Sequence, residues 1–157
     1  TLNLTNINYS SYNESLKDLD FLKNFKKIKS LNITLNGGYG SSENVESLDV
    51  IKNFNALESL VLRGIPTEIN LDFLLDCKGL KFLILDFNNN NNNNETINLE
   101  CLKNCSLLEK LILNNIGEIN IEGKISDINQ LNELENLRTL KIKDIIISGI
   151  NDKVFIK

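Results

Sequence analysis

A pattern of apolar residues recurs along most of the chain, and it restricts the possible folds more than any other feature. Five segments follow L-x-x-L-x-x-φ-x-x-L-x-x-L-x-L-x-x-[N/I], where φ is apolar, and they begin at Leu19, Leu48, Leu71, Leu99 and Ile128. Residues 2–7 match the end of a further unit. The equivalent leucines, 23 to 29 residues apart, are Leu2, Leu31, Leu60, Leu83, Leu111 and Leu140. Self-similarity at such a period is the signature of a repeat protein.

The spacing of the apolar residues changes inside each unit. In the third unit Leu71, Leu74 and Cys77 recur at every third position, which is typical of a 3₁₀ helix or another tightly wound short helix. Leu83 and Leu85 then alternate, which predicts a short strand. One such unit cannot bury its apolar face, whereas a stack of about three or more can. We therefore predict a solenoid with strands near residues 2–5, 30–34, 59–63, 82–86, 110–114 and 139–143.

These segments resemble the leucine-rich repeat family over nearly the whole chain. The spacing before each strand is similar to the short-repeat subclass of protein-phosphatase-1 regulatory subunits and bacterial internalins. The resemblance implies an α/β solenoid, with a curved parallel sheet on its concave face and short 3₁₀ or α segments on its convex face. We expect residues 1–157 to form a single domain of about five and a half repeats. Because the chain starts without Met, we expect it to be a fragment of a longer one.

Two features depart from the regular pattern. The family's Asn after the strand is present as Asn36 and Asn88 but is replaced by Ile65, Ile116 and Ile145. The resemblance implies that this Asn bonds the backbone amides of a loop, so three turns must satisfy theirs in another way. Extra residues follow the strands at Gly37–Asn44, Asn88–Asn94 and Gly117–Asp127. Lengthening a loop costs little, so we interpret the Asn run as a surface loop.

The alternation within each strand also predicts which side chains face away from the core. The residues between and beside the two marked leucines face solvent on the concave side. In the middle units these residues are apolar, with charged residues at the rim, a composition typical of a protein interface. We predict a protein-binding site formed by Val61, Arg63, Phe82, Ile84, Asp86, Phe87, Lys110, Ile112, Asn114, Lys141 and Lys143. The alternative is that β-propensity alone placed Val, Ile and Phe there.

The composition argues against several other classes of partner. The net charge is −4 and the pI about 4.9, whereas nucleic acids and anionic membranes need a basic face. The basic run Lys23–Lys29 is interpreted as a solvated ridge, because acidic residues balance it overall. No apolar run approaches the roughly 18 residues of a membrane span.

Motifs for cofactors, metals and catalysis are incomplete. The stretch GGYGSSE has Gly38 and Gly40 but Glu43 where a dinucleotide fingerprint needs a third Gly. A calcium loop starting at Asp86 would lack its turn Gly at Asn91 and its Glu at Ile97. The chain has no His, the commonest general base and metal ligand. We predict no cofactor, no metal site and no enzymatic activity.

The cysteines and the glycosylation sequons bear on the compartment. Cys77 and Cys105 occupy equivalent positions in neighbouring units, where other units have Phe25, Phe54 and Leu134, and we expect the two cysteines to stack as small apolar core residues. A disulfide between Cys77 and Cys105 is a less favoured alternative. Sequons at Asn3 and Asn32 lie on the predicted concave face, where a glycan would obstruct binding. This favours a cytoplasmic chain over an extracellular or cell-surface one.

The sequence thus predicts a non-catalytic module that binds another protein through its concave face. Apolar residues would supply affinity, and Arg63, Asp86 and the lysines specificity. The alternatives are a regulatory subunit of a phosphatase-like enzyme and an extracellular adhesin or receptor ectodomain. Occupied sequons and an oxidised Cys77–Cys105 pair would indicate the extracellular alternative, which intact mass with thiol counting detects.

Overall fold

The computed structural model describes residues 1–8, 19–36, 47–66, 69–87, 99–114 and 131–142, in which strands alternate with short 3₁₀ segments. The strands are β1 (Leu2–Asn8), β2 (Ser30–Asn36), β3 (Ser59–Ile65), β4 (Phe82–Phe87), β5 (Lys110–Asn114) and β6 (Thr139–Ile142). The 3₁₀ segments are η1 (Asp20–Asn24), η2 (Asp49–Asn53), η3 (Asp72–Asp76), η4 (Leu99–Leu102) and η5 (Leu131–Glu133). One helical segment and the strand that follows it are called a rung below.

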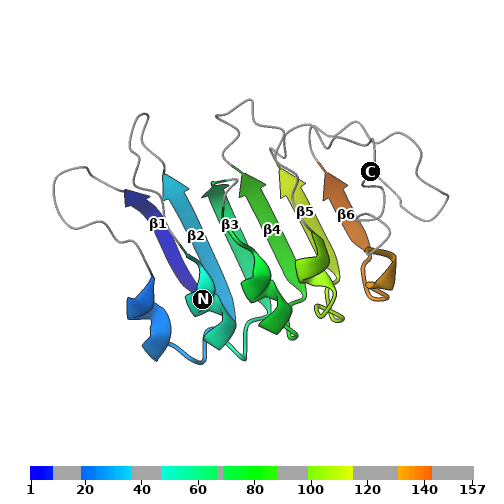
Figure 1. The fold of residues 1–157 in the computed structure, drawn as a ribbon, viewed down its shortest axis with the longest axis horizontal. Coiled ribbons are helices and arrows are strands. Elements are labelled where there is room, and N and C mark those ends of the chain that lie inside the picture. Colours follow the sequence, from blue (N-terminus) through cyan, green and yellow to red (C-terminus); the bar gives the residue numbers. More distant parts are fainter. Residues whose placement is uncertain (9–18, 37–46, 67–68, 88–98, 115–130, 143–157) are drawn as a thin grey trace.

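The six strands form one sheet in the order of the sequence (Figure 1), and every neighbouring pair is parallel. The equivalent leucines lie opposite one another from strand to strand, beginning with Leu2 opposite Leu31 and ending with Leu111 opposite Leu140. Each strand begins at the residue at which the repeat pattern placed it. The parallel sheet and the 3₁₀ segments confirm the predicted fold class.

Burial alternates along the strands as the pattern requires. In β4, Leu83 and Leu85 are fully buried, and Ile84 between them is only partly buried. The same alternation holds in β3 and β5. At roughly 1.5–3 kcal/mol for each buried Leu or Ile side chain, these columns supply the main favourable term of the fold before entropy is subtracted.

A third buried column extends the core beyond the two predicted ones. It consists of Leu35, Ile65 and Phe87. Ile65 lies opposite Phe87 because β3 bulges between Arg63 and Ile65, where Gly64 adopts a positive φ of 67°. A Cβ at residue 64 would collide with the carbonyl oxygen of Leu35, so this position requires glycine.

The prediction that Phe87 belongs to the concave binding face is therefore wrong. Phe87 is 3% exposed and packs in the core, because the alternation of β4 continues for one residue beyond Asp86. Ile65, which the pattern aligned with Asn36 and Asn88, is likewise a core residue of its strand.

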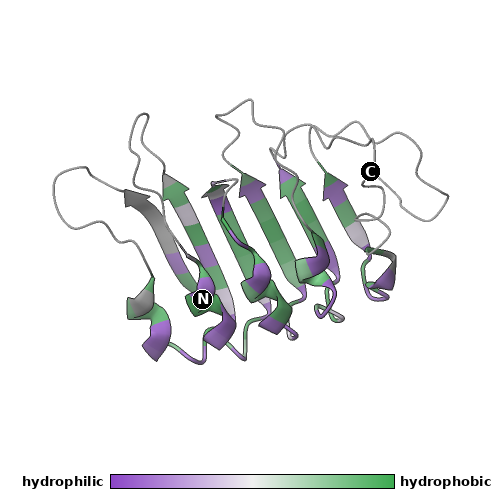
Figure 2. Cartoon of the chain, viewed as in Figure 1, coloured by the Kyte–Doolittle hydropathy of each residue, from purple (hydrophilic) through white to green (hydrophobic). Residues whose placement is uncertain are grey.

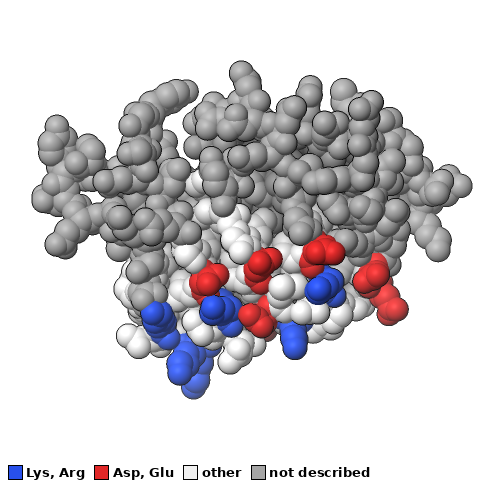
Figure 3. Space-filling model, viewed as in Figure 1, with Lys and Arg blue, Asp and Glu red and all other residues white. Residues whose placement is uncertain are grey.

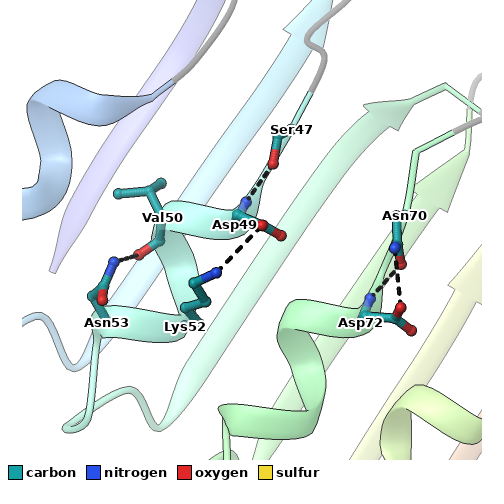
Figure 4. Close-up of polar contacts among 7 residues, drawn as sticks. All are labelled: Ser47, Asp49, Val50, Lys52, Asn53, Asn70 and Asp72. Atoms are coloured by element: carbon teal, nitrogen blue, oxygen red, sulfur yellow. Dashed lines mark hydrogen bonds and ion pairs between the residues drawn. The ribbon is translucent and has the colours of Figure 1, made fainter.

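Local bonds hold the 3₁₀ segments in place. Each turn closes through a backbone bond across three residues, as from the Leu74 amide to the Leu71 carbonyl at 2.9 Å. The Ser47 hydroxyl accepts from the Asp49 amide at 3.0 Å, and the Asn70 side chain accepts from the Asp72 amide at 2.8 Å (Figure 4). These side chains satisfy backbone amides at the start of η2 and η3, which have no partner inside the helix.

Asparagine side chains also bond one rung to the next. Asn104 donates to the Leu75 carbonyl of the preceding rung at 3.0 Å, and Asn136 donates to the Ser106 carbonyl at 2.8 Å. Within η2, Asn53 donates to the Val50 carbonyl of its own segment at 3.2 Å, and Lys52 lies 3.3 Å from Asp49 (Figure 4). These polar contacts complement the apolar stacking that joins the rungs.

Candidate protein-binding face

The face of the sheet opposite the buried leucines is called the open face below. Its middle row contains Val61, Ile84 and Ile112, which lie opposite one another on β3, β4 and β5. All three are half-buried, because side chains on neighbouring strands about 4.7–4.9 Å apart shield one another. They form a continuous apolar strip across three rungs. Figure 2 shows apolar residues along most of β4, with hydrophilic colour near its end.

Polar residues bound this strip at both ends of the same row. Asn32 lies opposite Val61 on β2, and Lys141 lies opposite Ile112 on β6. Lys141 is exposed and Asn32 is half-buried. The apolar surface is therefore confined to the three central strands of the described sheet.

The row before the strip combines an aromatic ring with a cation. Phe82 and Lys110 lie opposite each other on β4 and β5, and the ammonium of Lys110 is 5.4 Å from the centre of the Phe82 ring. A cation at this distance is attracted to the face of the ring. Ser59 and Thr139 continue the row on the flanking strands.

The row after the strip is polar and charged. Arg63 lies opposite Asp86, and Asp86 opposite Asn114. The guanidinium of Arg63 donates to the Asn32 side chain at 2.9 Å, a contact that joins this row to the N-terminal boundary of the strip. Because its partner is a neutral amide, this bond does not cancel the charge of Arg63.

The structure brings together most of the residues predicted for the site. Eight lie partly buried on β3, β4 and β5, on the open face: Val61, Arg63, Phe82, Ile84, Asp86, Lys110, Ile112 and Asn114. Lys141 lies exposed on β6, Phe87 is in the core, and Lys143 lies outside the described residues. That this face binds a partner stays a prediction.

Two exposed phenylalanines were not anticipated. Phe25 is 50% exposed, whereas Phe54, at the same position of the next unit, is 2% exposed. Phe21 on η1 is 47% exposed. Among the described residues no 3₁₀ segment precedes η1. These two rings therefore lack the neighbouring segment that the later units have.

A column of alternating charge directly before the strands was also missed. It contains Lys29, Glu58, Lys81, Glu109 and Arg138. Backbone bonds of 2.8–2.9 Å join each residue to the one before it, from the Glu58 amide to the Lys29 carbonyl and onward to the Arg138 amide. The repeat alignment contained this signal, because all five occupy one position of the unit.

Glu58 forms ion pairs with both neighbours in this column. Its two carboxylate oxygens lie 3.1 Å from Lys29 and 3.0 Å from Lys81. Hydrogen bonds from Lys81 and then Lys29 lower the pKa of Glu58 below its ordinary value of 4.5. In Figure 3, acidic and basic side chains are interspersed over the described part of that view.

The three cysteines are buried and are in the thiol form. Cys77 donates to the Phe73 carbonyl at 3.5 Å, and Cys105 donates to the Leu74 carbonyl at 3.4 Å. Burial raises the pKa of Cys77, Cys101 and Cys105 to about 12, so they remain protonated at neutral pH and behave as small apolar residues. Within the described ranges, no cluster of three or more His, Cys, Asp or Glu side chains is suited to hold a metal ion. The helices described here include none that is long and apolar enough to cross a membrane.

Comparison with known proteins finds a likeness in structure. No protein-family model matches the chain, and no curated protein matches it. The structure is similar to that of an internalin from Listeria monocytogenes, with a TM-score of 0.58 and 24% sequence identity. The match covers 84% of this chain and 33% of the internalin chain, so this chain spans about a third of the internalin's length. This likeness and the six-stranded parallel sheet of stacked rungs show that the chain has the fold of a leucine-rich repeat solenoid.

Proposed function

We propose that the chain is a non-catalytic module that binds another protein through the open face of its sheet. The observation that supports this most is the apolar strip of Val61, Ile84 and Ile112, which the fold places away from its own core. Stacked repeats present an extended binding surface of this kind, because each rung adds one strand to a common face.

The strip has the layout of an interface. Phe82 enlarges the apolar surface, and the charged residues Arg63, Asp86 and Lys110 lie on its two sides. Burying the apolar centre against a partner would supply affinity, whereas the charged residues would select the partner and orient it. Lys141, Asn114 and Lys143 complete the proposed set, although Lys143 lies outside the described residues.

We also propose a cytoplasmic location. The three cysteines are thiols buried in the core, which is the state that a reducing compartment maintains. Intact mass with thiol counting tests this location, because occupied sequons or oxidised cysteines would contradict it.

Affinity capture from an extract of the source cells tests the binding face. Replacing Phe82→Asp together with Ile84→Asp places two charges in the apolar centre, and we expect it to abolish capture of the partner. Leu107→Asp is the matched control, because Leu107 is 46% exposed and lies in the turn before β5, away from the open face. If wild type and the double variant capture the same proteins, the open face is not the binding site.

A milder variant separates lost binding from lost folding. Val61→Thr with Ile84→Thr keeps the β-branched shape that suits a strand and removes apolar surface. We expect an unchanged melting temperature within a few degrees and weaker capture. Unchanged capture by this folded variant would also contradict the proposal.

A further inference from the structure

We infer that the partner presents an amphipathic α-helix with acidic flanks, which lies across the strands along the apolar strip. This inference rests on the proposed function and adds the class of segment that the open face accepts. It follows from the spacing of the strip and from the sign of its surrounding charges.

The spacing of the strip matches one helical turn. Val61, Ile84 and Ile112 are consecutive across β3, β4 and β5, so they repeat at the distance between strands, about 4.7–4.9 Å. A helix rises about 5.4 Å per turn, and its residues at i, i+3 or i+4, and i+7 lie on one face. Three successive apolar residues of a helix can therefore each meet one rung, with a mismatch of about 1 Å over the strip.

An extended strand fits the same strip less well. Its side chains return to one face only every about 6.6–6.8 Å, which exceeds the spacing of the rungs by nearly 2 Å at each step. By the third rung an extended segment would be out of register with Ile112 by more than 3 Å, roughly the width of a methyl group. The geometry thus favours a helix whose axis runs perpendicular to the strands.

The charges of the open face select an acidic helix. On the described part of this face, Arg63, Lys110 and Lys141 are cationic and Asp86 is anionic. The described part of the open face therefore carries a net positive charge, whereas the whole chain has a net charge of −4. Lys110 and Lys141 lie on β5 and β6, toward the C-terminal end of the strip. We therefore expect carboxylates on the partner helix near the turn that meets Ile112, where they would lower the free energy of the complex and speed association.

Site-specific photo-crosslinking in the full chain tests the inference. Three separate variants carry p-benzoyl-phenylalanine in place of Val61, Ile84 or Ile112, and a fourth carries it in place of Leu107 as a control away from the face. After capture from an extract of the source cells, mass spectrometry locates the crosslinked partner residues. A helix predicts that the three sites label one continuous segment, in order, at positions three or four residues apart.

The possible outcomes separate this inference from the proposed function. Labels at positions two residues apart, or in segments distant in the partner's sequence, would overturn the helix but leave the binding face intact. Labelling from position 107 alone, or from none of the four sites, would overturn both.

A synthetic peptide of the labelled segment provides the second measurement. Its affinity for the chain should fall at least about tenfold when a central residue outside the contact stripe is replaced by proline, which breaks a helix. Replacing its acidic residues with lysine should weaken binding further, and added salt should weaken binding of the unaltered peptide. A proline variant that binds as well as the original peptide would contradict the helix.

Discussion

The first helical segment and those that follow use the same repeat positions in opposite environments. Phe21 on η1 is 47% exposed, whereas Phe73, at the same position on η3, is 2% exposed. Phe25 and Phe54 differ in the same way. The residue type is the same in both comparisons, so the difference arises from the surroundings.

The difference shows that burial in this molecule depends on the preceding rung. The segments η2, η3 and η4 each pack against the 3₁₀ segment before them, whereas η1 has no such segment before it among the described residues. Repeat proteins gain stability from contacts between neighbours as well as within each unit. Phe21 and Phe25 therefore lack the cover that a preceding segment gives to their equivalents, whereas Leu19 and Leu22 of the same rung are buried.

The largest effect that would test this comparison is the loss of an aromatic core residue. Phe73→Ala should reduce the free energy of unfolding by about 3–5 kcal/mol, because it leaves a cavity between rungs. Phe21→Ala should reduce the free energy of unfolding by about 1 kcal/mol, because Phe21 is already 47% exposed to solvent. Chemical denaturation of both variants measures the difference. Equal losses would show that η1 is packed as tightly as η3.

A cysteine at position 25 should reveal the same contrast through reactivity. In the native state, Cys77 and Cys105 should resist a thiol-reactive dye at about pH 8, because burial holds their pKa near 12. Phe25→Cys places a thiol in the same column on the uncovered rung, where we expect rapid labelling of one group. Wild type should react only after denaturant is added, which serves as the control. Protection of the new thiol would indicate that the first rung is covered.

The smallest effect concerns the charges that join the first rung to the next. Glu58→Gln removes the ion pairs with Lys29 and Lys81, which are exposed, so we expect a slightly lower melting temperature at neutral pH. Folding lowers the pKa of Glu58, so its contribution is fully present above the ordinary value of 4.5 and is lost as the pH falls through the lower folded pKa.

Thermal unfolding at about pH 7 and about pH 3 checks this linkage. The difference between wild type and Glu58→Gln should shrink in acid, and it should also shrink in high salt. Glu135→Gln, a change of an exposed glutamate in the last rung, controls for loss of charge alone. A difference that persists unchanged in acid would exclude the ion pairs as its cause.

The sequence predicted the strands and the two main core columns because their spacing recurs in every unit. Phe87 was misplaced because the pattern marked two inward residues per strand, whereas the alternation of β4 includes a third. The sequence indicated that the repeat is irregular at this point. Leu35 and Gly64 occupy the same position of the repeat on neighbouring strands, but Leu35 is apolar and Gly64 is a residue that favours turns and bulges.

The exposure of Phe21 and Phe25 could not be predicted from their own unit, because it depends on whether another 3₁₀ segment packs against them. The rows of the open face followed from the strand positions, and of the predicted site residues that the structure describes only Phe87 departed from them. Binding itself has no such local signature, since Val and Ile also favour strands that bind nothing.

The alternating column of Lys29, Glu58, Lys81, Glu109 and Arg138 favours some changes in the number of repeats over others. Excision of the single repeat that carries Glu58 would bring Lys29 next to Lys81, and like charges directly opposite each other are destabilising. Excision of two consecutive repeats, with Glu58 and Lys81, would bring Lys29 next to Glu109 and preserve the alternation. Duplication of one repeat would likewise place two like charges side by side, whereas duplication of two consecutive repeats would not. Recombination between these repeats is therefore tolerated best when it adds or removes them in pairs.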